Sequence, residues 1–295
     1  MCNADPVPTP TFTAVDRAYE AELQAEPDPR IAWLLRQTAA TSASRRALLS
    51  SLGIGPGSQV LDVGTGFGCV PIELAVLGPV QAIGVDVDDQ VLQAARRIAD
   101  SVAAAGELAE GSTVELRRGD ALDLPVDDAS VDVATARFLY QYMADPEELT
   151  DELARVVRPG GLVCVVDVDD GLSITEPEPS PAFERLASAF RAAQQAAGGD
   201  RSIGRRLARI LDAGGFDIAA VLVLPQAAYG PSLPGDLGRQ LLLERFRLHR
   251  ADMVATGAIS EEQFDADLDE VAGEVVHGQC QIEAHLAVVG GRRVL

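Results

Sequence analysis

The feature that most constrains the fold is an alternation of short apolar runs with helix-like segments. The apolar runs are residues 59–64, 80–86, 113–120, 130–136 and 162–168. Residues 69–77 and 89–104 between them read as helices, and the second segment places its apolar side chains at helical spacing. This pattern is typical of parallel strands joined by crossover helices. It predicts an α/β fold with helices on both faces of the sheet.

The rest of the chain is richer in helix. We expect helices over 13–53, 145–158, 181–197, 203–213, 236–256 and 261–276. Two further strands are expected at 216–225 and 280–290. The Pro-rich residues 1–12 are expected to be loosely packed.

Composition narrows the class of partner. The chain has 295 residues, 47% of them hydrophobic, and a formal net charge of −21. Nucleic-acid binders neutralise phosphates with basic residues, so this acidity argues against DNA, RNA and anionic lipid. It favours a small-molecule substrate. A homodimer is allowed, although nothing in the sequence requires one.

Several further features are expected to be absent. The start has no basic and apolar leader, which predicts no secretory signal, and no run of about 18 apolar residues could span a membrane. The four cysteines form no CxxC pair, and the three histidines show no ligand spacing. We therefore expect a cytoplasmic protein with reduced thiols and no metal.

A glycine-rich turn, DVGTGFG at 62–68, lies where the first strand is expected to pass into a helix. Glycines there allow a tight turn and let a ligand approach the backbone. A dinucleotide-binding turn would have a third glycine where this chain has Cys69, and Asp62 would discourage a pyrophosphate. The turn thus favours a ligand with an ammonium or sulfonium group, while a purely structural turn explains the glycines alone equally well.

Two further acids end predicted strands. Asp86 follows the turn by about 20 residues, where a carboxylate can accept hydrogen bonds from both ribose hydroxyls. Asp120 can accept from an adenine amino group while the Ala121 amide donates to a ring nitrogen. Each alone could be a capping or turn residue. Together with Asp62 they are expected at the carboxyl edge of the sheet, where ligands of open α/β sheets bind.

Four motifs in order carry a resemblance to a known family. They are DVGTGFG (62–68), GVDVDD (84–89), GDALDLP (119–125) and ARFLYQYMADPEELTDELARVVRPGGLVCVVD (136–167). The chain resembles the class I S-adenosylmethionine-dependent methyltransferases, particularly the small-molecule branch of quinone and natural-product biosynthesis. The resemblance is strong over about 58–170 and weaker over 201–225.

The resemblance implies S-adenosylmethionine as the cofactor, S-adenosylhomocysteine as the product and no metal. The cofactor-binding positions that it implies are Asp62, Gly64, Thr65 and Gly66 at the methionine end, Asp86 at the ribose, Val87, Asp120 and Ala121 at the adenine, and Arg137 beside the transferred methyl group.

It also implies a Rossmann-like sheet of seven strands, mostly parallel, with the last strand antiparallel. We divide the chain into an N-terminal helical cap, 1–50, and a methyltransferase core, 51–295. The helical insert at about 227–278 is expected to form a lid over the substrate together with residues 13–45.

The catalytic candidates are Tyr19, which could close over the methyl group, and Asp167 and Tyr142, which follow predicted strands. Many relatives carry His where this chain has Tyr142, so a different base is needed here, or none. Asp169 and Asp170 extend the Asp167 cluster, and such carboxylates suit an N–H or O–H donor on a neutral or cationic, ring-containing acceptor.

Weaker candidates remain beside these. Tyr140 could face the same site, whereas the acidic surface is the better explanation for Arg201 and Arg205, and a solvated helix face is the better one for His249. Two alternative functions stay open: a protein on this fold that binds S-adenosylmethionine without methyl transfer, such as a regulator or cyclase, and an NAD-dependent oxidoreductase.

Overall fold

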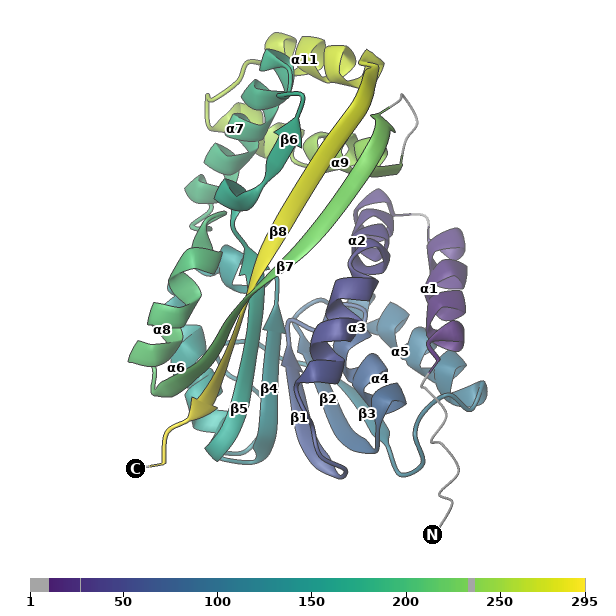
Figure 1. The fold of residues 1–295 in the computed structure, drawn as a ribbon, viewed down its shortest axis with the longest axis vertical. Helices are drawn as coiled ribbons and strands as arrows, with labels where there is room; N and C mark the ends of the chain where they lie inside the picture. The colour runs from purple at the N-terminus through teal and green to yellow at the C-terminus, as the bar shows by residue number, and fades with distance from the viewer. Residues whose placement is uncertain (1–10, 27, 233–236, 295) are drawn as a thin grey trace.

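The computed structural model describes residues 11–26, 28–232 and 237–294 (Figure 1). Their strands form one sheet of eight in the order β3-β2-β1-β4-β5-β8-β6, with β7 paired to the other edge of β8. The predicted α/β fold with a mostly parallel sheet is confirmed. The predicted count of seven strands is one short, because β6 (Ile174–Glu176) has only three residues and no apolar run from which a strand could be predicted.

Five parallel strands form the centre of the sheet. They are β1 (Ser58–Val63), β2 (Val80–Asp86), β3 (Thr113–Arg118), β4 (Val131–Arg137) and β5 (Val157–Val168). Neighbouring residues of β1 point to opposite faces, so Val60 packs in one hydrophobic cluster and Leu61 in another. Both side chains are fully buried, as expected for a strand covered on both faces.

One face of the sheet is covered by α4 (Cys69–Leu77), α5 (Asp89–Ala104) and the N-terminal helices. The other is covered by α6 (Pro146–Val156), the short helix η3 (Ile203–Arg206) and α8 (Leu207–Ala213). Two of these helices begin at aspartates: Asp88 caps α5, and Asp145 accepts from the Glu148 amide at the start of α6.

The expected N-terminal helix is three helices. They are α1 (Thr13–Ala25), α2 (Pro29–Ala40) and α3 (Ser42–Ser51). Asp28 caps α2 and Pro29 occupies its first turn, which starts a new helix and breaks the longer one. The expectation for residues 1–10 lies outside the described residues.

The last two strands, β7 (Phe216–Ser232) and β8 (Val276–Arg292), are far longer than predicted. They pair with each other along most of their length, and β8 is also antiparallel to β5, as expected of the last strand. Figure 1 shows this antiparallel pair of strands rising past the central sheet towards a second group of helices.

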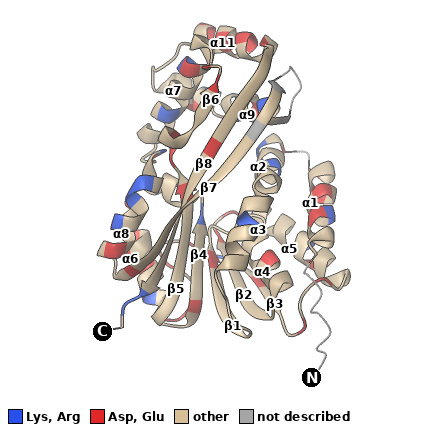
Figure 2. Ribbon diagram, viewed as in Figure 1, with Lys and Arg blue, Asp and Glu red and all other residues tan. Residues whose placement is uncertain are grey.

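That group has its own hydrophobic cluster. It consists of α7 (Pro181–Ala196), α9 (Leu237–Leu248), α10 (Arg250–Ala255) and α11 (Glu261–Gly273). The helix expected at 236–256 is interrupted at His249, whose backbone N–H is shared between the carbonyls of Arg245 and Phe246. Acidic positions gather on α11 (Figure 2).

No described helix is long and apolar enough to cross a membrane.

Candidate active site

A cleft of about 1460 Å³ extends from the carboxyl edge of the sheet to the helices α7 and α9. The cleft is lined by all nine cofactor-binding positions that the resemblance implies: Asp62, Gly64, Thr65, Gly66, Asp86, Val87, Asp120, Ala121 and Arg137. Small-molecule sites usually measure about 300–1,000 Å³. This cleft therefore has room for a cofactor and a second molecule beside it.

The glycine turn exposes its backbone to the cleft. Gly64, Gly66 and Gly68 all have positive φ, a conformation that glycine adopts without strain. A Cβ added at Gly66 would meet no atom within 4 Å, whereas one at Gly64 would come within 3.1 Å of the Leu139 side chain. Gly66 thus faces the open part of the cleft, and a ligand can lie directly against its backbone.

Asp86 holds this turn in place and keeps acceptor capacity free. Its Oδ2 accepts from the Gly66 amide at 2.8 Å, and its Oδ1 accepts from the Asp88 amide at 3.0 Å. A carboxylate has about four lone-pair sites, so both oxygens can still accept a hydroxyl. The geometry suits a ligand with two neighbouring hydroxyl groups.

Asp62 is buried below the turn. Its carboxylate accepts from the Thr135 hydroxyl at 2.6 Å. Burial raises the pKa of Asp62 to about 6, against the lowering effect of the hydroxyls of Thr135 and Thr65 and of the Arg137 guanidinium. The Thr65 hydroxyl is itself buried and makes no hydrogen bond of standard geometry in the described part of the chain. Both groups are therefore available to a ligand.

Arg137 lies across from Asp62 at the end of β4. Its guanidinium donates to the Thr41 hydroxyl at 3.2 Å and lies 4.3 Å from the centre of the Phe138 ring. Burial lowers the pKa of Arg137, and none of the described carboxylates forms an ion pair with it. The guanidinium is partly buried in the cleft wall, and a charge withdrawn from water without a counter-ion is costly unless an anion joins it. This position fits the carboxylate of a methionine-like ligand.

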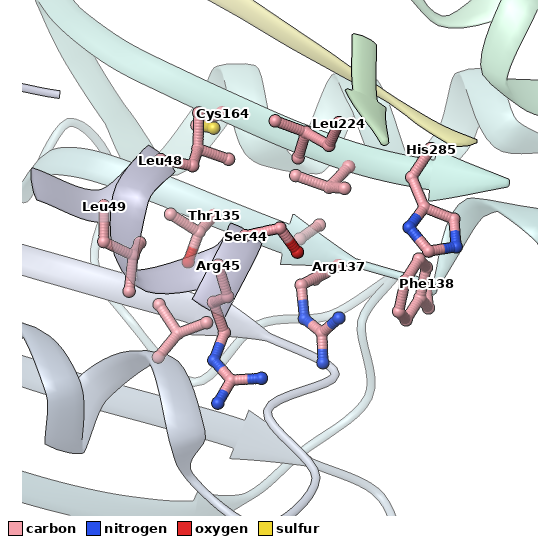
Figure 3. Close-up of a pocket in the computed structure, with 13 residues that line it drawn as sticks. Ser44, Arg45, Leu48, Leu49, Thr135, Arg137, Phe138, Cys164, Leu224 and His285 are labelled. Atoms are coloured by element: carbon pink, nitrogen blue, oxygen red, sulfur yellow. The ribbon is translucent and has the colours of Figure 1, made fainter. Parts of the chain in front are cut away.

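A cavity of about 20 Å³ adjoins the cleft behind Arg137 (Figure 3). Figure 3 shows the guanidinium groups of Arg45 and Arg137 side by side and the His285 ring next to Phe138. The two arginines differ in charge balance. Arg45 donates two hydrogen bonds to the buried Glu73, at 2.7 and 2.8 Å, so its charge is already neutralised.

The expected adenine end is the open mouth of the cleft. Val87 is 65% exposed and lines the mouth together with Asp120 and Ala121. Asp120 accepts from the Leu122 amide at 2.9 Å, which fixes its carboxylate at the edge. The exposed Val87 side chain provides an apolar contact for a heterocycle, and the Ala121 backbone amide provides a hydrogen-bond donor.

The three aspartates at the end of β5 and just after it differ in their hydrogen-bond partners and in whether they face the cleft. Asp169 forms a bidentate ion pair with Arg205, and Asp170 one with Arg201. Asp167 is fully buried and accepts from the amides of Gln141 and Val168 at 3.1 and 2.8 Å, while burial raises its pKa to about 7. Of these three, only Asp170 is among the described residues that line the cleft.

The three candidate tyrosines also differ in whether they face the cleft. Tyr142, in the short helix η1 (Tyr140–Tyr142), lines the cleft, whereas Tyr140 is fully buried and bonds the Thr150 hydroxyl at 2.9 Å. Tyr19 is buried in the core, where its hydroxyl donates to the Phe67 carbonyl at 3.0 Å. It supports the backbone of the glycine turn from the core side, and it is not among the described residues that line the cleft.

His285 was not expected in the site. It is 6% exposed, lines the cleft and meets the Phe138 ring edge-on at 4.7 Å. Burial lowers the pKa of His285, and the charges of Arg137 and Arg201 add to this against Glu283. The imidazole is therefore neutral at pH 7. The signal in the sequence was a titratable side chain within the apolar run of the last strand, CQIEAHLAVVG.

The sheet order, the glycine turn and the acids at the strand ends define a class of protein. Residues 61–165 match the family described as a methyltransferase domain. The predicted class is confirmed over this stretch: residues 61–165 form a methyltransferase domain.

Individual relatives extend this comparison. The chain is 31% identical over 194 residues to an uncharacterized 37.1 kDa protein in a transposon of Streptomyces fradiae, covering 64% of this chain and 52% of that protein. It is 31% identical over 134 residues to an O-methyltransferase of Pyrenophora dematioidea, covering 45% of this chain and 48% of that one. The chain thus spans about half the length of these relatives.

Solved structures share the fold. A structure of geranyl diphosphate methyltransferase in complex with S-adenosylmethionine superposes with a TM-score of 0.51 at 18% identity. The match covers 92% of this chain and 94% of that one, so the fold is shared well beyond the domain matched in sequence.

Proposed function

We propose that this protein transfers a methyl group from S-adenosylmethionine to an oxygen, nitrogen or electron-rich carbon of a small, ring-containing metabolite. The observation that carries the proposal is the pair of opposite charges at one end of the cleft, Asp62 and Arg137. They act on each other electrostatically but form no ion pair. A ligand that ends in an ammonium and a carboxylate supplies a partner for each.

The residues have separate roles in this proposal. Asp62 holds the ammonium, Arg137 the carboxylate and Asp86 the ribose hydroxyls, while Val87 and Asp120 flank the adenine. When bound, the cofactor supplies a methyl group already activated by its sulfonium. The work of the chain is then to align the acceptor with that group and to exclude water.

A general base adds about 10²–10⁴-fold when the acceptor must lose a proton. His285 is our candidate for that base, because it is neutral at pH 7 and faces the cleft. Tyr142 lines the cleft with its side chain 55% exposed, and its phenol, which is protonated at neutral pH because tyrosine has an ordinary pKa of about 10, can orient an acceptor by donating a hydrogen bond. Asp167, behind Tyr142, fixes the backbone of η1 through the Gln141 amide.

The acceptor atom and the lid are finer points of the same proposal. The relative named O-methyltransferase supports oxygen as the acceptor atom. The helices between residues 13 and 51, together with α9 and its neighbours, would cover the acceptor, because α2 and α9 both contribute to the cleft wall. The acidic net charge of −21 supports a small molecule over a nucleic acid.

The proposal is tested by binding and by transfer. Asp86→Ala should weaken S-adenosylhomocysteine binding by about 1.5–3 kcal/mol in calorimetry, as expected for hydrogen bonds to a charged group. Asp89→Ala is the matched control, because Asp89 lies outside the cleft on the first turn of α5. Equal affinity in the two variants would remove Asp86 from the site, and tight NAD binding would overturn the class of ligand.

Transfer is tested with methyl-labelled S-adenosylmethionine and small-molecule extracts of the source organism. Label in a low-molecular-weight product is the expected result. Cofactor binding without any labelled product would instead favour a binding protein or a cyclase on this fold.

A further inference from the structure

Arg245 lines the cleft at the end far from the glycine turn and has no anionic partner in the described chain. It belongs to α9, and its guanidinium lies 4.9 Å from the centre of the Phe190 ring and 5.7 Å from that of Phe246. Its Nε is shut off from solvent and makes no hydrogen bond to a described residue. The residue as a whole is half-buried, and a guanidinium partly withdrawn from water is costly unless an opposite charge is supplied.

The neighbouring arginine shows what a satisfied cation looks like in the same wall. Arg201 binds Asp170 with three hydrogen bonds of 2.7–3.2 Å and also donates to the Gln141 side chain at 2.8 Å. Asp170 is therefore occupied and is not free to pair with Arg245. The other carboxylate that acts on Arg245 is Glu283 of β8, which lines the cleft but forms no ion pair with it.

Arg245 remains a cation at neutral pH. Burial lowers its pKa to about 10, and the nearby positive charge of Arg201 contributes to this. Arginine presents donors in a planar fork that matches a carboxylate. Around it, Phe183, Phe190 and Leu242 provide apolar wall.

We propose that Arg245 binds a carboxylate of the methyl acceptor, so that the acceptor is an aromatic or otherwise apolar acid. This inference rests on the proposed function, because it treats this end of the cleft as the acceptor site. It replaces the expectation of a neutral or cationic acceptor. That expectation depended on the carboxylates after β5, and Asp167, Asp169 and Asp170 are all engaged within the chain.

A matched pair of probes tests the proposal directly. Binding of 4-hydroxybenzoate and of 4-hydroxybenzamide is measured by calorimetry, with and without S-adenosylhomocysteine. The wild-type protein should bind the carboxylate about tenfold or more tightly than the amide, as expected for charged hydrogen bonds. In Arg245→Met this preference should fall below about twofold, while Arg245→Lys should keep part of it.

Two controls separate the site from general effects. Arg247→Met removes an exposed cation of the same helix that is not part of the cleft, and it should leave the preference unchanged. Glu283→Gln removes the competing carboxylate and should tighten carboxylate binding severalfold. Melting temperature and S-adenosylhomocysteine affinity show whether each variant is folded.

The outcomes separate this proposal from the previous one. Equal binding of the two probes, no binding of the carboxylate, or an unchanged preference in Arg245→Met would each overturn the carboxylate site. Failure to bind S-adenosylhomocysteine would overturn the proposed function, and the carboxylate preference can still be measured in that case without the nucleoside.

Discussion

The proposed role of Asp62 predicts that cofactor binding depends on pH. Burial raises its pKa to about 6, so the carboxylate is ionised at pH 8 and mostly protonated at pH 5. Only the ionised form attracts an ammonium group, so affinity must be present above this pKa and lost as the pH falls through it. We expect the affinity for S-adenosylhomocysteine to fall about tenfold between pH 8 and pH 5.

Calorimetry at several pH values checks this expectation. Asp62→Asn should bind weakly at every pH and show no such slope, because its amide does not titrate. A wild-type slope that survives in Asp62→Asn would assign the titration to another group.

His285 gives a second pH prediction, which concerns turnover. Its lowered pKa means that the neutral, basic form prevails above about pH 6.5, the ordinary value for histidine. With any acceptor that supports turnover, kcat should fall on the acidic side of a pKa below that value. Saturating S-adenosylmethionine removes the contribution of Asp62 to the profile.

His285→Asn should lower kcat by about 10²–10⁴-fold and remove the acidic limb, if the acceptor must lose a proton. The readout that a structural role would not move is the shape of the profile. A variant with reduced kcat but an intact acidic limb would limit His285 to packing against Phe138.

At single residues, the positions that could be predicted are those fixed by the backbone. Gly66, Asp86 and Asp120 lie at strand ends, so the strand pattern alone brings them to one edge. Tyr19 and Asp167 were placed by chain position, but the direction of their side chains depends on packing against α4 and η1. The binding role proposed for Arg245 could not be predicted from the sequence, because its lack of an anionic partner depends on contacts between distant segments.

At the scale of elements, α2 and α9 meet across the cleft although they lie far apart in the chain. The Trp33 indole N–H donates to the Leu241 carbonyl at 2.7 Å, and Arg36 forms an ion pair with Glu244 at 2.6 Å. These contacts join the helical insert to the N-terminal helices, the two segments that are expected to form the lid (Figure 1).

A charge-swap series tests this contact. Arg36→Glu and Glu244→Arg should each speed amide hydrogen exchange in α9 and raise the KM for the acceptor about two- to fivefold, because a partly exposed ion pair contributes at most about 1 kcal/mol. The double variant should restore both. S-adenosylhomocysteine affinity should stay within about twofold throughout.

Arg250→Ala serves as the control, since it removes an ion pair with Asp265 that lies outside the cleft. If each single variant has wild-type exchange in α9, the contact does not hold the lid.

Elements that are determined by the local sequence could be predicted, whereas elements that depend on contacts with distant segments could not. The strands β1, β2 and β4 and the helices α4 and α5 could be predicted almost to the residue, because apolar periodicity and Asp88 mark them. The ends of these strands farthest from the central sheet, residues 226–232 of β7 and 276–279 of β8, could not be predicted. Their residues near Gly230 and Gly278 show no apolar alternation, and they are strands only because they pair with each other.

At the scale of the whole molecule, the net charge of −21 and the local cations of the cleft act over different distances. Screening limits each charge to about 10 Å at 0.1 M salt, so the total charge governs approach and the local groups govern the bound state. This separates two ligands of nearly equal shape. S-adenosylmethionine carries a net positive charge because of its sulfonium, and S-adenosylhomocysteine is neutral overall.

The acidic surface should therefore speed the association of S-adenosylmethionine but not that of its product. Between about 0.02 and 0.5 M salt, we expect the association rate constant of S-adenosylmethionine to fall about threefold or more, as for other steered ligands. That of S-adenosylhomocysteine should change little. Stopped-flow measurements in KCl give both rates, and Asp62→Asn should keep the salt dependence because one local carboxylate contributes little to the long-range field. Equal salt dependence for the two nucleosides would show that the surface charge does not steer the cofactor, and that the acidity serves solubility alone.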